Sequence, residues 1–316
     1  RRAHVHPGLP APPHPSPDTS AMSRRPASHA GSWYTNKRSE LTGQLAGWLQ
    51  AVEAPEGPAR AVIAPHAGYS YSGPTAAHAY RAIDPATTRR IFVLGPSHHV
   101  YLRDCALTRA EVYETPVGDL RVDRATVEEL RRGGEFSWMD AGTDADEHSI
   151  EMHLPYIAHV MRGRDVGVVP VLVGALSPES EARYGRLLAP YLQDAGTVFV
   201  ASSDFCHWGR RFRYTYYDKR HGEICQSIEA LDRMGMEHIE NLDPAGFQAY
   251  QEEFQNTICG RHPIAVLLHA IRAHPQGAFQ CRFVRYAQSS SVTRPDDSSV
   301  SYASAVITAG PGAGRA

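Results

Sequence analysis

Several features that would assign a compartment or a membrane role are missing from this chain of 316 residues. Its longest apolar run, 166–176, is interrupted by glycine and proline and is too short to cross a bilayer. Its five cysteines form no C-x-x-C pair, and there is no N-x-[ST] site. Dispersed cysteines in odd number are typical of a reducing compartment. We therefore expect a cytoplasmic protein without membrane insertion, with the nucleus left open as a second location.

An excess of charge of one sign and several enzyme motifs are also missing. The formal net charge of −2 argues against a nucleic-acid partner or a membrane-surface role. Neither G-x-G-x-x-G nor G-x-x-x-x-G-K-[ST] occurs, so dinucleotide and P-loop sites are excluded. The lack of G-x-S-x-G weakens a serine hydrolase, and no cysteine has arginine six residues later, as a phosphatase loop would need. A metal or thiol site fits the sequence best.

What is present is typical of a folded α/β protein. Hydrophobic residues make up 42% and charged residues 21% of the chain, enough for a sizeable core. Apolar strands alternate with segments of helical spacing over 28–308. This pattern predicts one domain, a three-layer α/β/α sandwich whose sheet is largely parallel, with antiparallel strands near its end. We expect 1–27 to be a disordered leader and 309–316 a flexible tail.

Three local patterns carry more specific expectations. Pro74 is placed in the first turn of a helix that ends near Ile83. Pro170 lies inside the expected strand 168–173, which predicts an edge position or a bulge. The acidic segment 144–151 is expected to be a solvated loop.

Histidines follow the ends of apolar strands. Strand 61–64 leads to His66, and strand 91–94 leads to His98. In open α/β sheets, ligands bind outside the carboxyl ends of the strands, and imidazole binds Zn, Cu, Fe and Ni. Each histidine alone is as easily a surface residue, but the matching positions favour a shared metal site. His148 is a candidate to contact these ligands without binding the metal itself.

Two further stretches carry reactive side chains. Strand 198–201 leads to Asp204 and His207, which could act as a base and its orienter; the alternative is a helix cap by Asp204. Cys259 precedes a helix start, where the helix dipole and nearby Arg or His would lower its pKa and give a thiolate. A small core residue is the equal alternative for Cys259.

A basic aromatic loop follows His207. Arg210, Arg211 and Arg213 alternate with aromatic residues in 210–217. Arginine forks bind phosphate, and aromatic faces suit a phosphotyrosine ring. A solvated basic loop is an equally good interpretation.

The motifs together resemble the Memo family, mediators of ErbB-driven cell motility. They span about 28–308 in the family's order and include SHAGSWY (28–34), APHAGY (64–69), GPSHHV (95–100), DEHSIEMHLPY (146–156), SSDFCHWG (202–209) and NTICGRHP (256–263). The resemblance implies a fold similar to that of class III extradiol dioxygenases, which hold iron through two histidines and a glutamate.

Residue by residue, the resemblance places His66 and His98 as metal ligands, His207 as acid/base, and Cys259 where the dioxygenases have the carboxylate. It implies one copper or iron ion, redox chemistry rather than ring cleavage, and a role as effector of receptor tyrosine kinase (ErbB) signalling in cell migration. The implied partners are the phosphorylated ErbB tail or its adaptors, and cytoskeletal regulators. Arg261 is a further candidate to bind the phosphopeptide. His262, like His148, is a candidate to contact the metal ligands without binding the metal itself. A metal-dependent oxidoreductase or dioxygenase acting on a small substrate is the alternative.

Overall fold

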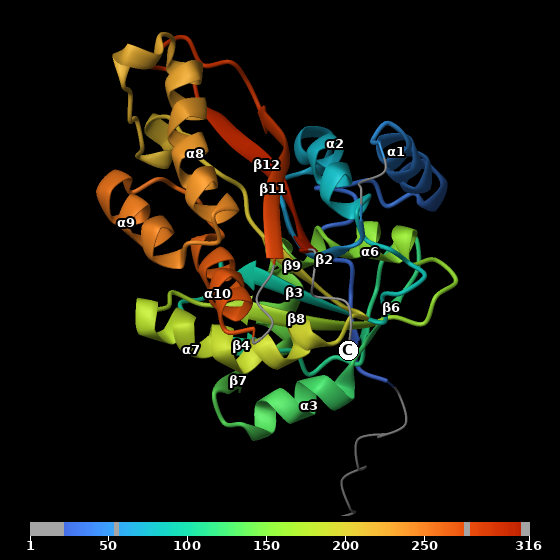
Figure 1. The fold of residues 1–316 in the computed structure, drawn as a ribbon. Coiled ribbons are helices and arrows are strands. Elements are labelled where there is room, and N and C mark those ends of the chain that lie inside the picture. Colours follow the sequence, from blue (N-terminus) through green and yellow to red (C-terminus); the bar gives the residue numbers. More distant parts are fainter. Residues whose placement is uncertain (1–21, 54–56, 275–278, 311–316) are drawn as a thin grey trace, which may run out of the picture.

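A mixed sheet organises the computed structural model, which describes residues 22–53, 57–274 and 279–310 (Figure 1). Along the sheet the strand order is β1-β5-β6-β8-β3-β9-β2-β12-β10, with β11 beside β12 and the pair β4 and β7 beside β8. The strands are β1 (Arg24–Arg25), β2 (Ala59–Ala64), β3 (Arg90–Pro96), β4 (Cys105–Leu107), β5 (Val112–Tyr113), β6 (Leu120–Val122), β7 (Phe136–Trp138), β8 (Gly167–Val173), β9 (Thr197–Ser202), β10 (His207–Trp208), β11 (Phe279–Gln288) and β12 (Ser299–Ala309).

The centre of the sheet, β6-β8-β3-β9-β2, is parallel, because its strands are joined by helical crossovers. Antiparallel β12 and β11 extend it from β2. The central strands are apolar on both faces and buried; Phe92 of β3 and Phe199 of β9 stack with ring centres 4.5 Å apart. Continuous apolar strands of this kind need cover on both sides.

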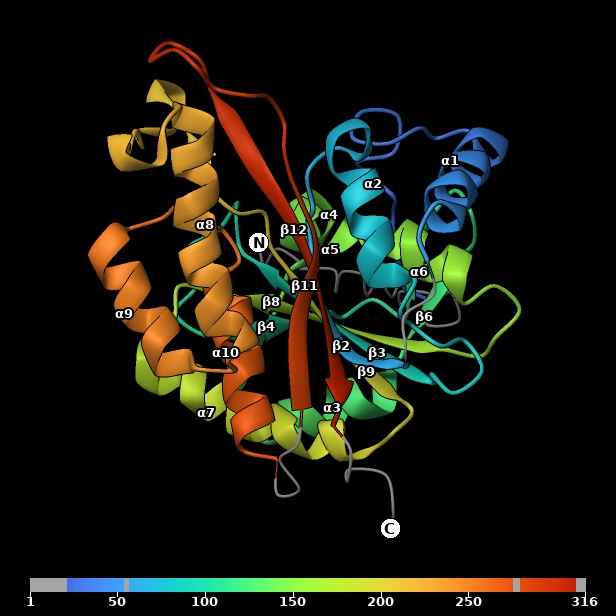
Figure 2. The same cartoon turned by 45° about the horizontal axis from the view of Figure 1, so that its top comes forward.

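Helices supply that cover on both faces (Figure 2). They are α1 (Arg38–Gln50), α2 (Tyr69–Tyr80), α3 (Arg124–Arg132), α4 (Ala141–Asp146), α5 (His148–Glu151), α6 (Leu154–Val160), α7 (Pro178–Leu188), α8 (Ile224–Glu240), α9 (Pro244–Phe254) and α10 (Arg261–Arg272). Helix α2, with α1 and α6 against it, contacts β2 and β12, whereas α10 contacts β9 and β3 and packs on α7 and α9. The predicted three-layer α/β/α sandwich with a largely parallel sheet is confirmed.

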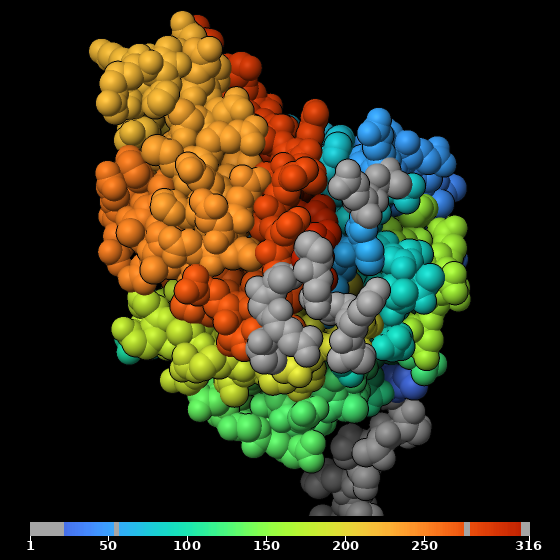
Figure 3. Space-filling view, viewed as in Figure 1, coloured from blue at the N-terminus to red at the C-terminus, as the bar shows by residue number. Residues whose placement is uncertain are grey.

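Figure 3 shows one face of the molecule, with α8 and α9 on one side of β11 and the α1–α2 pair on the other. Among the residues that the structure describes, no helix combines the length and the apolar character that a membrane crossing requires.

Both proline predictions were wrong. Pro74 lies inside α2, which already begins at Tyr69; the N–H of Tyr69 donates to the carbonyl of Trp33, 3.0 Å away, and starts the helix early. Pro170 lies in a central strand, opposite Val93 of β3. On its other side β8 pairs with β6 only as far as Val168 and with β4 only from Val171. Pro170 falls between these partners, so its missing N–H disrupts neither ladder.

The predicted leader extends too far along the chain. Arg24 and Arg25 form β1, which pairs in parallel with β5. Arg25 is buried and its guanidinium donates to Glu151, 2.6 Å away. The rest of the leader, 1–21, lies outside the described residues. At the other end, Ala309 still belongs to β12, and residues 311–316 of the predicted tail lie outside the described part.

The acidic segment is not a solvated loop. It forms α4 and α5, and Asp144, Glu147 and Glu151 are all buried. Buried carboxylates need partners, and these come from distant parts of the chain. Arg25 contacts both Asp144 and Glu151. Composition alone suggested a solvated segment, because Arg25, which pairs with Asp144 and Glu151, lies more than a hundred residues away along the chain.

Candidate metal centre

Three neighbouring parallel strands bring the predicted site residues together. In the sheet, β9 lies between β2 and β3. The segments that follow these strands therefore leave the same edge, and they carry His66, His98 and the pair Asp204 and His207. The geometry confirms that the strand ends converge, as the repeated pattern of strand followed by histidine indicated.

Cys259 reaches this edge from the start of α10. Gly260 allows the approach, because a Cβ there would lie 2.3 Å from the carbonyl oxygen of Ser202. The N–H of Gly260 also donates to the Ser203 hydroxyl, 3.0 Å away. The start of α10 is thus fixed against the end of β9, and Cys259 is held beside the histidines.

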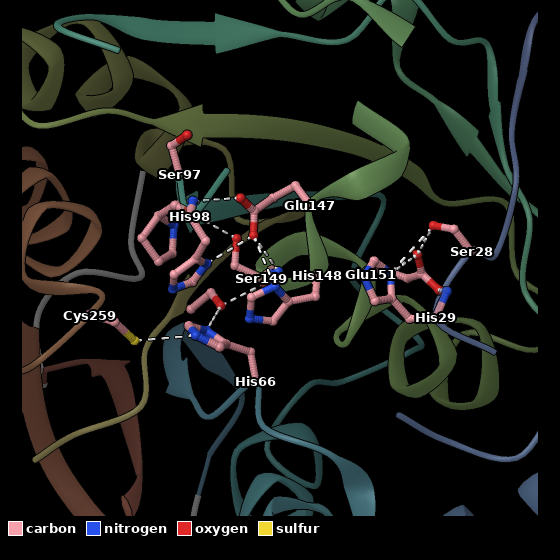
Figure 4. A network of polar contacts seen from close by, with 12 residues as sticks. Ser28, His29, His66, Ser97, His98, Glu147, His148, Ser149, Glu151 and Cys259 are labelled. Atoms are coloured by element: carbon pink, nitrogen blue, oxygen red, sulfur yellow. Dashed lines mark hydrogen bonds and ion pairs between the residues drawn. The ribbon is translucent and has the colours of Figure 1, made fainter. Parts of the chain in front are cut away.

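The ligand atoms of His66, His98 and Cys259 all lie within 4.8 Å of one another (Figure 4). The Nε2 atom of His66 is 3.2 Å from Sγ of Cys259. Two imidazole nitrogens and one sulfur at this spacing could hold a transition-metal ion. The residues present therefore fit the metal that the resemblance implied.

Ser202 orients the imidazole of His66. The Ser202 hydroxyl donates to the carbonyl of Ser149, 2.7 Å away, so it can only accept from Nδ1–H of His66 at 2.6 Å. This leaves the lone pair on Nε2, the atom that faces Cys259. Burial, together with the neighbouring His98, lowers the pKa of His66 well below its usual value. His66 is therefore a neutral imidazole, the form that binds metals.

Glu147 orients the imidazole of His98 in the same way. Its carboxylate accepts from the backbone N–H of His98 at 2.7 Å and from Nδ1 at 3.0 Å. Burial opposes ionisation of Glu147, but the hydrogen bonds from His98 outweigh it and lower the pKa to about 2. A carboxylate behind a histidine fixes the tautomer and strengthens the imidazole as a ligand.

The predicted low pKa of Cys259 was wrong. Burial raises the pKa of this thiol well above its usual value, and the nearby Asp204 raises it further. The N–H of Asp204 donates to Sγ at 3.3 Å but does not overcome these effects. Metal binding at Cys259 must therefore displace a proton.

Asp204 and His207 lie close to the site but are not arranged as predicted. The Asp204 carboxylate accepts from the backbone N–H of His66, 2.9 Å away, and no helix follows it to be capped, since β10 comes next. The His207 ring is held instead by the carbonyls of Phe205 and Thr257, 2.9 and 3.0 Å from Nδ1. Nδ1 thus carries the proton, and Nε2 of His207 is left as an acceptor.

His148 and His262, both expected to contact the metal ligands, lie in different places. His148 stacks on His98 with ring centres 4.4 Å apart and lies 5.4 Å from the His66 ring. His262 pairs with Glu181 of α7 at 2.6 Å and accepts from the guanidinium of Arg261. Arg261 and His262 line a separate cavity of about 200 Å³ between α7, α9 and α10. His262 therefore does not support the metal ligands in this structure.

The basic loop lies next to His207. Phe212 contacts the His207 ring with centres 5.2 Å apart, and the Arg211 guanidinium lies 4.4 Å over the Phe212 ring. In the described part of the chain, Arg210, Arg211 and Arg213 are exposed and have no carboxylate within 4.0 Å. Arg261 points into the separate cavity and is not part of this loop.

Comparison with known proteins places this geometry in a family. The family model described as Memo-like protein matches residues 25–306. The chain belongs to the Memo family. It is 55% identical to Protein MEMO1 of Danio rerio, over 92% of this chain and 99% of that protein, and 54% identical to human Protein MEMO1, over 90% and 97%. An uncharacterized protein of Escherichia coli K12 aligns with a TM-score of 0.49 at 14% identity, over 77% and 98% of the two chains.

Membership of the Memo family agrees with the motifs from which it was predicted. The residues that sequence reasoning missed are Ser202 and Glu147, which fix the ring orientation of the two histidines. Ser202 closes β9 and had no distinguishing feature in the sequence. Glu147 lay in the segment interpreted as a solvated loop. Its position directly before His148, within the motif DEHSIEMHLPY, was the signal in the sequence; in the structure its side chain caps α5.

Proposed function

We propose that this Memo-family chain holds one copper or iron ion through His66, His98 and Cys259. The observation that carries the proposal is the convergence of three suitable donor atoms within 4.8 Å. Two further features support it: the neutral state of His66 and the hydrogen bonds that direct both rings. Copper or iron bound there would supply one-electron redox chemistry.

The chain's own residues set the limits of that chemistry. Cys259 supplies sulfur where a ring-cleaving facial triad has a carboxylate, so we do not propose ring cleavage. His207, with Nε2 unprotonated, can accept a proton from a group bound beside the site. Its Nε2 does not belong to the converging donor set, which suits a proton acceptor better than a ligand.

A competition between Cu(I) and Fe(II) under reducing, oxygen-free conditions tests the metal site. The wild type should prefer Cu(I), because thiolate is a soft ligand, and Cys259→Glu should shift the preference towards Fe(II). Cys225→Ala, which alters a half-buried cysteine elsewhere, is the control. If wild type and Cys259→Glu show the same preference, Cys259 is not a ligand.

The second part of the proposal concerns signalling. We propose that the chain acts as an effector of receptor tyrosine kinase (ErbB) signalling in cell migration and binds a phosphotyrosine peptide of the receptor or an adaptor. The specific observation in its favour is the loop with Arg210, Arg211 and Arg213, all three exposed, in which the Arg211 guanidinium lies over the aromatic ring of Phe212. Such groups are free to bind phosphate with charge-assisted hydrogen bonds.

A further inference from the structure

A second set of donor atoms shares His98 with the first. His98, Glu147 and His148 place one ligand atom each within 4.8 Å of the others. Oε1 of Glu147 is 3.0 Å from Nδ1 of His98 and 3.5 Å from Nδ1 of His148. Figure 4 shows the Glu147 carboxylate beside both rings, on the side of His98 away from Cys259.

These spacings match the edges of a coordination sphere. Imidazole nitrogen and carboxylate oxygen lie roughly 2.0–2.2 Å from a bound divalent ion. Donor atoms at angles between square and tetrahedral are then about 3–3.5 Å apart. Both measured separations fall in that range. The His98 and His148 rings are stacked at 25°, so one ring must turn before both nitrogen lone pairs face the same ion.

We propose that His98, Glu147 and His148 form a second, alternative metal position that favours divalent cations over Cu(I). Its donors are two imidazoles and a carboxylate, which suit harder ions than the thiolate of Cys259 does. The position rests on the proposed function only in sharing His98, because its donor set is complete without His66 or Cys259.

Sharing His98 makes the two positions mutually exclusive. The first position uses Nε2 of His98 and needs a proton on Nδ1, which Glu147 accepts at 3.0 Å. The second position uses Nδ1 and moves the proton to Nε2. A neutral imidazole has one lone pair, so one ion is held at a time. The identity of the ion then decides which position is filled.

Of the two histidines that the positions do not share, His148 is the more exposed. The side chains of His98 and His148 are 27% and 13% exposed, whereas His66 is 2% exposed. The His148 ring stacks on Trp33, with centres 4.4 Å apart, and Trp33 itself is at the surface. His148 thus lies nearer the surface than His66, whereas Glu147 is as buried as His66.

Co(II) titration followed by absorption spectroscopy tests this proposal. In Cys259→Ala, one Co(II) should still bind, and the thiolate-to-cobalt charge-transfer band should be absent. Adding His148→Phe should weaken this binding by at least about tenfold, because a ligand is lost. Phenylalanine preserves the ring between Trp33 and His98, and the control in the same background is His159→Ala, a half-buried histidine on α6.

Three outcomes would overturn the inference. These are loss of Co(II) binding in Cys259→Ala, equal affinity with and without His148→Phe, and two ions per wild-type chain. A different result would contradict the proposed function: the absence of a thiolate-to-metal band when the wild type is titrated with Co(II), Cu(I) or Fe(II). In that case a His148-dependent site in Cys259→Ala would still support the second position.

Discussion

Ser202 connects the backbone of α5 to the imidazole of His66. Its hydroxyl donates to the Ser149 carbonyl and accepts from Nδ1 of His66. Ser202→Ala removes this acceptor, so the imidazole can rotate or change tautomer. We expect the affinity for Cu(I) to fall by about 10–100-fold, as is typical for groups that orient a metal ligand.

A competition titration with a Cu(I) chelator measures this effect. Ser304→Ala is a matched control, because Ser304 is also a buried serine whose hydroxyl donates to a carbonyl, that of Thr75, in another part of the sheet. Unchanged affinity in Ser202→Ala, or an equal loss in both variants, would contradict the assigned role.

At the residue scale, the sequence indicated chemical types better than ionisation states. His66, His98 and Cys259 could be selected because ligand residues have distinctive side chains and the strand ends have a recognisable pattern. The pKa of Cys259 could not be predicted, since it depends on burial and on Asp204, which is 55 residues away along the chain. Ser202 was missed because a serine shows its hydrogen-bond partners only in three dimensions.

At the scale of elements, β1 is held to α5 by buried ionic contacts. Glu151 accepts from Arg25 and from Nδ1 of His29 at 2.6 and 2.8 Å. Burial opposes its ionisation, but His29, Arg25 and Tyr34 together lower its pKa from 4.5 to about 2. Because the folded-state pKa lies below the unfolded one, the ionised carboxylate stabilises the fold above pH 4.5.

This stabilisation should disappear as the pH falls from about 4.5 to about 2, with a loss of about 3 kcal/mol in the free energy of unfolding. Glu151→Gln should be less stable at pH 6, because buried Arg25 loses the closer of its two carboxylate partners and keeps only Asp144. It should lose less stability between pH 6 and pH 3. Urea unfolding at the two pH values measures both effects. Glu237→Gln, an exposed glutamate on α8, is the control; identical pH dependence in Glu151→Gln and wild type would refute the assignment.

The elements themselves were largely predictable where one local signal dominated. Strands β2, β3 and β9 were apparent as short apolar runs, and α3 as a helix that begins after Asp123, which caps it. The errors occurred where tertiary contacts outweigh composition. The buried acids of α4 and α5 and the strand at Arg24 and Arg25 depend on each other, so neither could be recognised alone.

At the scale of the whole molecule, the proposed phosphopeptide surface predicts a charge-dependent interaction. Replacing Arg210, Arg211 and Arg213 together by Ala should weaken binding of a phosphotyrosine peptide by about tenfold or more, because charge-assisted hydrogen bonds are lost. Wild-type affinity should fall as salt is raised. Fluorescence anisotropy with phosphorylated and unphosphorylated peptide measures both effects.

The control for net charge is a triple Ala variant of Arg272, Arg282 and Arg285, three arginines that are exposed elsewhere on the surface. It should bind the phosphopeptide as the wild type does. If the loop variant keeps wild-type affinity, or if both triple variants lose it equally, the loop is not the recognition site.

The donors of the first metal position are far apart in the chain, from His66 after β2 to Cys259 before α10. Parallel strands are joined by long crossovers, so their ends meet only after the whole βαβ series has folded. During synthesis a ribosome releases the two histidines well before the cysteine. A growing chain can therefore offer imidazole alone, and the sulfur-containing set is completed only when α10 docks on β9. A metal ion can therefore bind to the complete set of donors only after Cys259 has been synthesised and α10 has docked.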